Sequence, residues 1–127
     1  MTIYALSSGP GVSGVAIVRI SGPEASNVIK SLTGKEIPKP RMATLRKINN
    51  INTSELIDEG IIIWFPGPQS YTGEDMAEIH VHGGKAVVLS VQDEISKNDM
   101  LKFNSISINL HFHKTEYLFV PMIPESA

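Results

Sequence analysis

An acid and two histidines occur at alternate positions near the middle of the chain: Glu78, His80 and His82. Alternate residues of a β-strand project to the same side, so a strand from Met76 to His82 would place one carboxylate and two imidazoles on one face. Such a face could bind zinc. Same-side neighbours lie about 6.6 Å apart, however, and no other motif supplies a further ligand. We therefore expect no metal, and for His82 we favour a hydrogen bond that caps the turn at Gly83-Gly84.

A second charged residue, Arg19, interrupts the apolar segment VAIVRI. Burying an unpaired guanidinium is costly, so Arg19 requires either a carboxylate from the same sheet or an anionic ligand held by its planar fork. These residues alone leave both alternatives open. Glu78 could accept two parallel hydrogen bonds from a heterocycle that presents an N–H beside an amine, as pterins and guanines do.

The glycine motifs of this chain do not indicate nucleotide chemistry. Residues 9–14, GPGVSG, match the dinucleotide-binding pattern G-x-G-x-x-G. That pattern requires a helix after the glycines, whereas here an apolar strand follows, so we expect a loop between two strands. The phosphate-binding pattern G-x-x-x-x-G-K-S/T is absent, and we expect no GTP binding or hydrolysis by this chain.

Composition favours one small domain without a strong attraction to nucleic acid. The chain has 127 residues, 42% of them hydrophobic, and a formal net charge of -2, which disfavours direct, tight nucleic-acid binding. The segment from Lys30 to Lys47 carries six basic residues and one acid and is interpreted as a solvated surface, with a phosphate-facing rim as the alternative. No cysteine, secretory signal or membrane-spanning run occurs, and a cytoplasmic location is expected.

Periodicity predicts six strands and two helices. The strands are expected at 3–6, 15–20, 42–48, 57–65, 76–82 and 105–113, and the helices after Ser21 to about Leu32 and at 85–97. Ser21 and Glu24 match a capping box for the first helix. This order predicts an α+β fold, a two-layer α/β sandwich in which a mixed sheet carries helices on one face.

Two stretches carry a resemblance to a known family: GVAIVRISGPEA at 14–25 and LIDEGIIIWFPGPQSYTGEDMAEIHVHGG at 56–84. They resemble the N-terminal domain of the MnmE (TrmE) family of tRNA-modification GTPases, with its V-R-I-S-G and S-Y/F-T-G-E-D-x-x-E-x-x-x-H-G-G patterns. The resemblance covers about residues 2–97. It implies a folate-binding and dimerisation domain at 1–98, related to the folate-binding domain of aminomethyltransferases, followed by a divergent segment at 99–127.

The resemblance also implies a function. Family members dimerise and hold 5-formyltetrahydrofolate, or another reduced folate, near the dimer interface. Arg19 and Glu78 match the family's folate-contacting arginine and glutamate. The full proteins add a helical domain and a GTPase domain and work with MnmG to modify the wobble uridine of tRNA. Neither extra domain is expected in this chain, so no catalytic residue is assigned.

Departures from the family keep two alternatives open. Residues 99–127 lack the P-G-E-F segment and the R-A-F-x-N-G-K stretch whose lysine contacts folate in the family, and Val12-Ser13 replaces the usual basic residue and glycine. One alternative is a degenerate relative without folate binding. The other is a stand-alone folate-dependent one-carbon transferase that uses His80 and His82 as acid or base.

Overall fold

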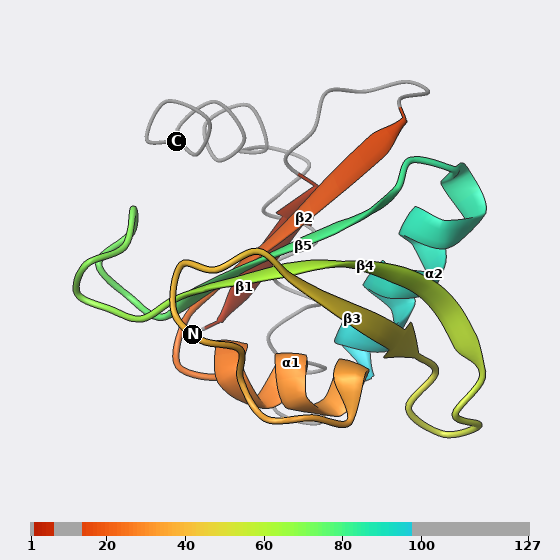
Figure 1. Cartoon of the computed structure of the whole chain (residues 1–127), viewed down its shortest axis with the longest axis horizontal. Helices are drawn as coiled ribbons and strands as arrows, with labels where there is room; N and C mark the ends of the chain where they lie inside the picture. Colours follow the sequence, from red (N-terminus) through yellow and green to blue (C-terminus); the bar gives the residue numbers. More distant parts are fainter. Residues whose placement is uncertain (1, 7–13, 98–127) are drawn as a thin grey trace.

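The computed structural model describes residues 2–6 and 14–97, which form a small α+β domain of two layers (Figure 1). The elements in chain order are β1 (Ile3–Leu6), β2 (Val15–Ser21), α1 (Ala25–Thr33), β3 (Thr44–Asn49), β4 (Leu56–Phe65), β5 (Met76–His82) and α2 (Lys85–Ser96). This is the predicted order for the first seven elements. The predicted strand at 105–113, and with it the segment 99–127, lies outside the described residues.

The five strands form one sheet in the order β1-β2-β5-β4-β3. Every neighbouring pair is antiparallel, so the prediction of a mixed sheet was wrong. A strand, a helix and a second strand in succession often produce a parallel pair. Here the chain leaves β2, passes through α1 and reaches the far edge of the sheet as β3. Because β5 then inserts between β2 and β4, no two strands of like direction become neighbours.

Both helices cover the same face of this sheet, as predicted. They contact each other as well as the sheet, and their apolar residues share one core with the strands. The fully buried members include Val18, Ile62 and Ile79 from the sheet, Ile29 from α1 and Ile95 from α2. Each such side chain stabilises the fold by about 1.5–3 kcal/mol relative to an exposed position. None of the helices in the part that the structure describes is long and apolar enough to cross a membrane.

The start of α1 differs from the predicted capping box. Ser21 is the last residue of β2, and its hydroxyl lies 2.8 Å from that of Thr72. Glu24 occupies the N-cap position without a side-chain capping bond. Its backbone N–H instead donates to the hydroxyl of Thr2, over 2.8 Å. The capping-box prediction was wrong because Ser21 continues the ladder with β5 and is therefore unavailable to the helix.

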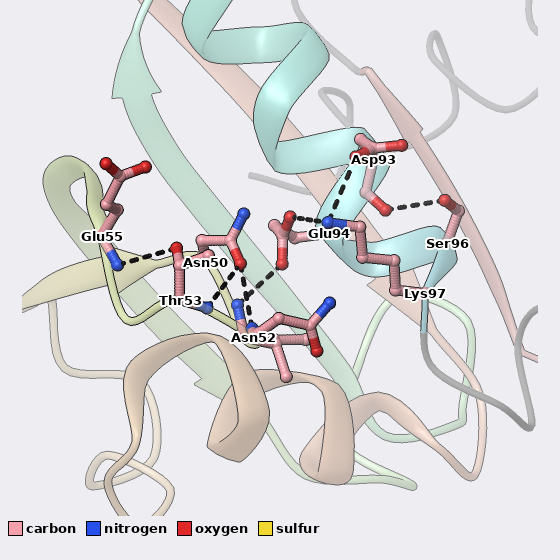
Figure 2. Close-up of polar contacts among 9 residues, drawn as sticks. Asn50, Asn52, Thr53, Glu55, Asp93, Glu94, Ser96 and Lys97 are labelled. Atoms are coloured by element: carbon pink, nitrogen blue, oxygen red, sulfur yellow. Dashed lines mark hydrogen bonds and ion pairs between the residues drawn. The ribbon is translucent and has the colours of Figure 1, made fainter.

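A buried carboxylate of α2 holds the turn between β3 and β4 (Figure 2). Glu94 is 2% exposed, and its Oε1 accepts a hydrogen bond from the backbone N–H of Ile51 over 2.8 Å. Its other oxygen, Oε2, accepts one from the Lys97 ammonium over 2.6 Å. Within the turn, the Asn50 side-chain oxygen accepts hydrogen bonds from the N–H groups of Asn52 and Thr53. These bonds connect the end of the sheet to the helix layer.

Candidate functional site

Strand register brings Arg19 and Glu78 together in the interior of the sheet. The two residues are direct cross-strand partners on β2 and β5, and both strands have neighbours on each side. Their side chains leave the sheet on the face opposite the helices, since their neighbours Val18 and Ile79 point into the helix-covered core. The side chain of Arg19 is 5% exposed and that of Glu78 is 14% exposed. The structure thus joins the two residues that sequence had placed in one ligand site.

A chain of hydrogen bonds links three side chains of this face. The Nε of Arg19 donates to Oε2 of Glu78 over 2.8 Å. The other oxygen, Oε1, lies 2.8 Å from Nε2 of His80. A carboxylate from the same sheet is therefore the direct partner of Arg19, which was one of the two alternatives for this residue.

The pairing with Glu78 leaves part of the Arg19 guanidinium unsatisfied. Its Nη1 is buried and has no hydrogen-bond partner among the described residues. Buried polar groups are nearly always hydrogen-bonded, and an unmet donor costs about 1–3 kcal/mol. An acceptor that reached Nη1 would recover this free energy, so the arginine has capacity for an additional, anionic partner.

The neighbours of Glu78 keep its carboxyl group ionised. Burial raises the pKa of Glu78, but the hydrogen bond from His80 and the charge and hydrogen bond of Arg19 outweigh burial and hold this pKa below its ordinary value. Glu78 is therefore an anion at neutral pH, a state that accepts hydrogen bonds and donates none. Among the described residues each of its oxygens accepts one bond, and further lone pairs can accept from a ligand.

His82 belongs to a different contact. Its ring Nδ1 lies 2.8 Å from Oδ1 of Asp58 on β4, and its backbone N–H donates to Oδ2 of Asp58 over 2.9 Å. The expectation that His82 caps the following turn was wrong: the N–H of Gly83 donates to the carbonyl of Gly14. Sequence reasoning missed Asp58, because its only signal was an acid within a strand whose partner strand was unknown.

The carboxylates and imidazoles of this region therefore form two separate pairs rather than one cluster. Glu78 is bonded to His80, and Asp58 is bonded to His82. Across residues 2–6 and 14–97, no group of three or more histidine or acidic side chains is arranged to hold a metal ion.

The surroundings of the Arg19-Glu78 pair are apolar. His80 faces Ile17 on β2 and Ile61 on β4, and Glu78 faces Ile63; these isoleucines are half-buried. At the sheet edge, Leu45 of β3 pairs with Ile61 and is 58% exposed. Such a face, with a charged centre and apolar flanks, suits a flat, partly apolar ligand or a second protein surface. Among residues 2–6 and 14–97, this face brings together no nucleophile and base of the kind that covalent catalysis uses.

Comparison with known proteins matches this domain to one family. A family model described as the N-terminus of the GTP-binding protein TrmE matches residues 2–105. The tRNA modification GTPase MnmE of Pelagibacter ubique (strain HTCC1062) is 69% identical over 97 residues, which cover 76% of this chain and 22% of that protein.

Eukaryotic proteins match as well. The mitochondrial tRNA modification GTPase gtpbp3 of Dictyostelium discoideum is 51% identical over 100 residues, which cover 74% of this chain and 20% of that protein. The mitochondrial tRNA modification GTPase mss1 of Schizosaccharomyces pombe is 56% identical over 87 residues, which cover 68% of this chain and 17% of that protein. The chain thus spans about a fifth of the length of these curated relatives.

Proposed function

Because this chain belongs to the family of TrmE N-terminal domains, we propose that it is a folate-binding, dimer-forming module of a tRNA-modifying system. The ligand is 5-formyltetrahydrofolate or a related one-carbon folate. The module supports modification of the wobble uridine, and GTP hydrolysis belongs to other parts of the family's longer proteins. The partners are a second copy of this chain and, through those other parts, MnmG and tRNA. The fold relationship to the folate-binding domain of aminomethyltransferases is part of this proposal.

The observation that carries the folate proposal is the unmet hydrogen-bonding capacity of the Arg19-Glu78 pair. Arg19 has a buried Nη1 without an acceptor among the described residues, and Glu78 is an anion with lone pairs left over. A pterin offers an N–H and an amine to a carboxylate, and a folate tail offers carboxylates to a guanidinium. In this proposal Glu78 accepts from the pterin and Arg19 donates to an acceptor of the same ligand.

The apolar flanks of the site support the dimer proposal. On the face that neither α1 nor α2 covers, the half-buried Ile17, Ile61 and Ile63 flank the charged centre, and the exposed Leu45 lies beyond them at the sheet edge. A second copy placed against this face would bury these side chains and exclude water from the ion pair. Because a ligand between two copies links binding to association, folate would shift the chain toward the dimer.

The test is a calorimetric titration with 5-formyltetrahydrofolate, combined with size measurement in the presence and absence of this ligand. The key variant replaces both members of the pair, Arg19→Met with Glu78→Leu. Replacing a buried ion pair by apolar residues of similar volume is often neutral or stabilising, so this variant should remain folded. The matched control is His82→Gln, which changes an imidazole on the same strand that is bonded to Asp58 instead.

We expect the wild type and the His82→Gln variant to bind folate and to increase in apparent size when it is present. The double variant should unfold in a cooperative transition, which shows that it is folded, and should have no detectable affinity for folate. Equal folate affinity in the wild type and the double variant would remove Arg19 and Glu78 from the site. No binding by the wild type would remove folate from the proposed function.

A further inference from the structure

His80 occupies the position between the buried ion pair and solvent. Its side chain is 24% exposed, whereas those of Glu78 and Arg19 are 14% and 5% exposed. Its Nε2 lies 2.8 Å from Oε1 of Glu78, so the ring orients the carboxylate that a ligand would meet. The family patterns that identify Arg19 and Glu78 leave position 80 unspecified, and the sequence had suggested His80 only as a zinc ligand or as an acid or base, not as a folate contact.

Few charged groups surround His80 in the part of the chain that the structure describes. Glu78 precedes it on the same face of β5, and Arg19 of β2 is bonded to the opposite oxygen of that carboxylate. Its direct partners across the sheet, Ile17 and Ile61, carry no charge. Further along β4, Asp58 is bonded to His82, and Glu59 is exposed opposite Lys47 of β3.

We propose that His80 is a third residue of the folate site, one that positions Glu78 and strengthens the binding of an anionic ligand when its ring gains a proton. This inference rests on the proposed function. With a neutral ring, the charges of Arg19 and Glu78 cancel. Protonation leaves Nε2–H donating to Glu78, turns Nδ1 from an acceptor into a donor, and gives the three groups a net charge of about +1. Both carboxylates of a reduced folate remain ionised above about pH 5.5.

The physical reason for the effect is the location of the added charge. A histidine is the side chain that ordinarily changes charge between about pH 5 and 8. A proton added to the His80 ring would place its charge near a buried guanidinium, and the apolar side chains of Ile17 and Ile61 on either side limit screening by water. We therefore expect folate to bind about 3- to 10-fold more tightly near pH 5.5 than near pH 8.

The experiment measures the dissociation constant of 5-formyltetrahydrofolate near pH 5.5 and near pH 8 for the wild type and two variants. His80→Gln keeps an N–H donor for Glu78 but cannot be protonated, so its affinity should be nearly independent of pH. His82→Gln is the matched control, because it removes the other carboxylate-bonded imidazole of β5 and should leave the pH dependence of the wild type intact. Urea unfolding at both pH values establishes that all three proteins are folded.

Each result decides the inference. The inference is supported if the folate affinity of His80→Gln no longer depends on pH while that of the wild type and His82→Gln still does. A pH dependence that persists in His80→Gln, or one that His82→Gln abolishes, would overturn it while the proposed function stands. Failure of the wild type to bind this folate at either pH would overturn the proposed function and the inference together.

Discussion

The guanidinium of Arg19 and the carboxylate of Glu78 meet across the junction of β2 and β5, with 2.8 Å between Nε and Oε2. Both side chains are largely withdrawn from water, so each neutralises a charge that the other could not leave unpaired. This relationship makes the pair a requirement of folding as well as a candidate for binding. The two roles can be separated, because removing one partner and removing both have different consequences.

The first prediction concerns stability changes at this pair. Glu78→Leu alone leaves a buried guanidinium without its partner and should lower the free energy of unfolding by about 3–5 kcal/mol. Adding Arg19→Met removes the uncompensated charge and should restore most of that loss. Urea unfolding of the wild type, both single variants and the double variant measures the coupling between the residues. Additive losses, with the double variant less stable than either single variant, would contradict the pairing.

The second prediction concerns acid unfolding. Burial raises the pKa of Asp58, but hydrogen bonds from the backbone N–H and ring of His82 and from the backbone N–H of Glu59 outweigh it and hold this pKa below its ordinary value of 3.8. The pKa of Glu78 likewise lies below its ordinary value of 4.5. A carboxyl group whose pKa is lower in the folded state than in the unfolded state stabilises the fold at pH values above its ordinary pKa. This stability is lost as the pH falls further, through the folded-state pKa values.

Urea unfolding between about pH 7 and 3 measures this loss. We expect a plateau near neutral pH and a steep decrease of the unfolding free energy below about pH 4.5. Asp58→Asn has no ionisable group at position 58, so its unfolding free energy should fall less steeply with decreasing pH in the acid range. An identical acid slope in the wild type and Asp58→Asn would mean that the contact with His82 does not stabilise the folded state.

Sequence periodicity was sufficient for the elements but not for their pairing. The alternation in MAEIHVH and the apolar run IIIWF predicted β5 and most of β4, because the periodicity and apolar character of a segment are local properties of the sequence. Which strand lies beside which depends on long-range packing, so the antiparallel pairing and the partner of His82 could not be derived. Arg19 and Glu78 were found from their chemistry, whereas their contact required the register of β2 against β5.

The third prediction concerns Gly60, where β4 approaches β5 closely. A Cβ atom at this position would lie 2.2 Å from the backbone oxygen of His80, closer than nonbonded atoms can pack. Gly60→Ala must therefore displace one strand, and we expect a loss of at least about 1–3 kcal/mol in unfolding free energy. Gly14→Ala is the matched control, since among the described residues no atom beyond its chain neighbours lies within 4 Å of its added Cβ, and it should change stability by less than about 0.5 kcal/mol. Chemical denaturation compares the two, and equal stabilities would contradict the close approach.

The fourth prediction concerns the hydrogen bond between the buried Glu94 carboxylate and the Ile51 backbone N–H, which joins α2 to the β3-β4 turn (Figure 2). Glu94→Ala leaves that N–H without its acceptor and should cost about 1–3 kcal/mol. The same change should speed hydrogen exchange at Ile51 more than at the centre of β5, because the turn can then open locally.

Asp93→Asn is the control: Asp93 is an exposed neighbour whose carboxylate pairs only with Lys97 in the described part of the chain, and its loss should cost less than about 1 kcal/mol. If Asp93→Asn destabilised the domain as much as Glu94→Ala, the Lys97 ion pairs rather than the bond to Ile51 would hold the turn. Hydrogen exchange at Ile51 distinguishes the two explanations, because the bond to Glu94 protects the Ile51 amide directly and the Lys97 ion pairs do not.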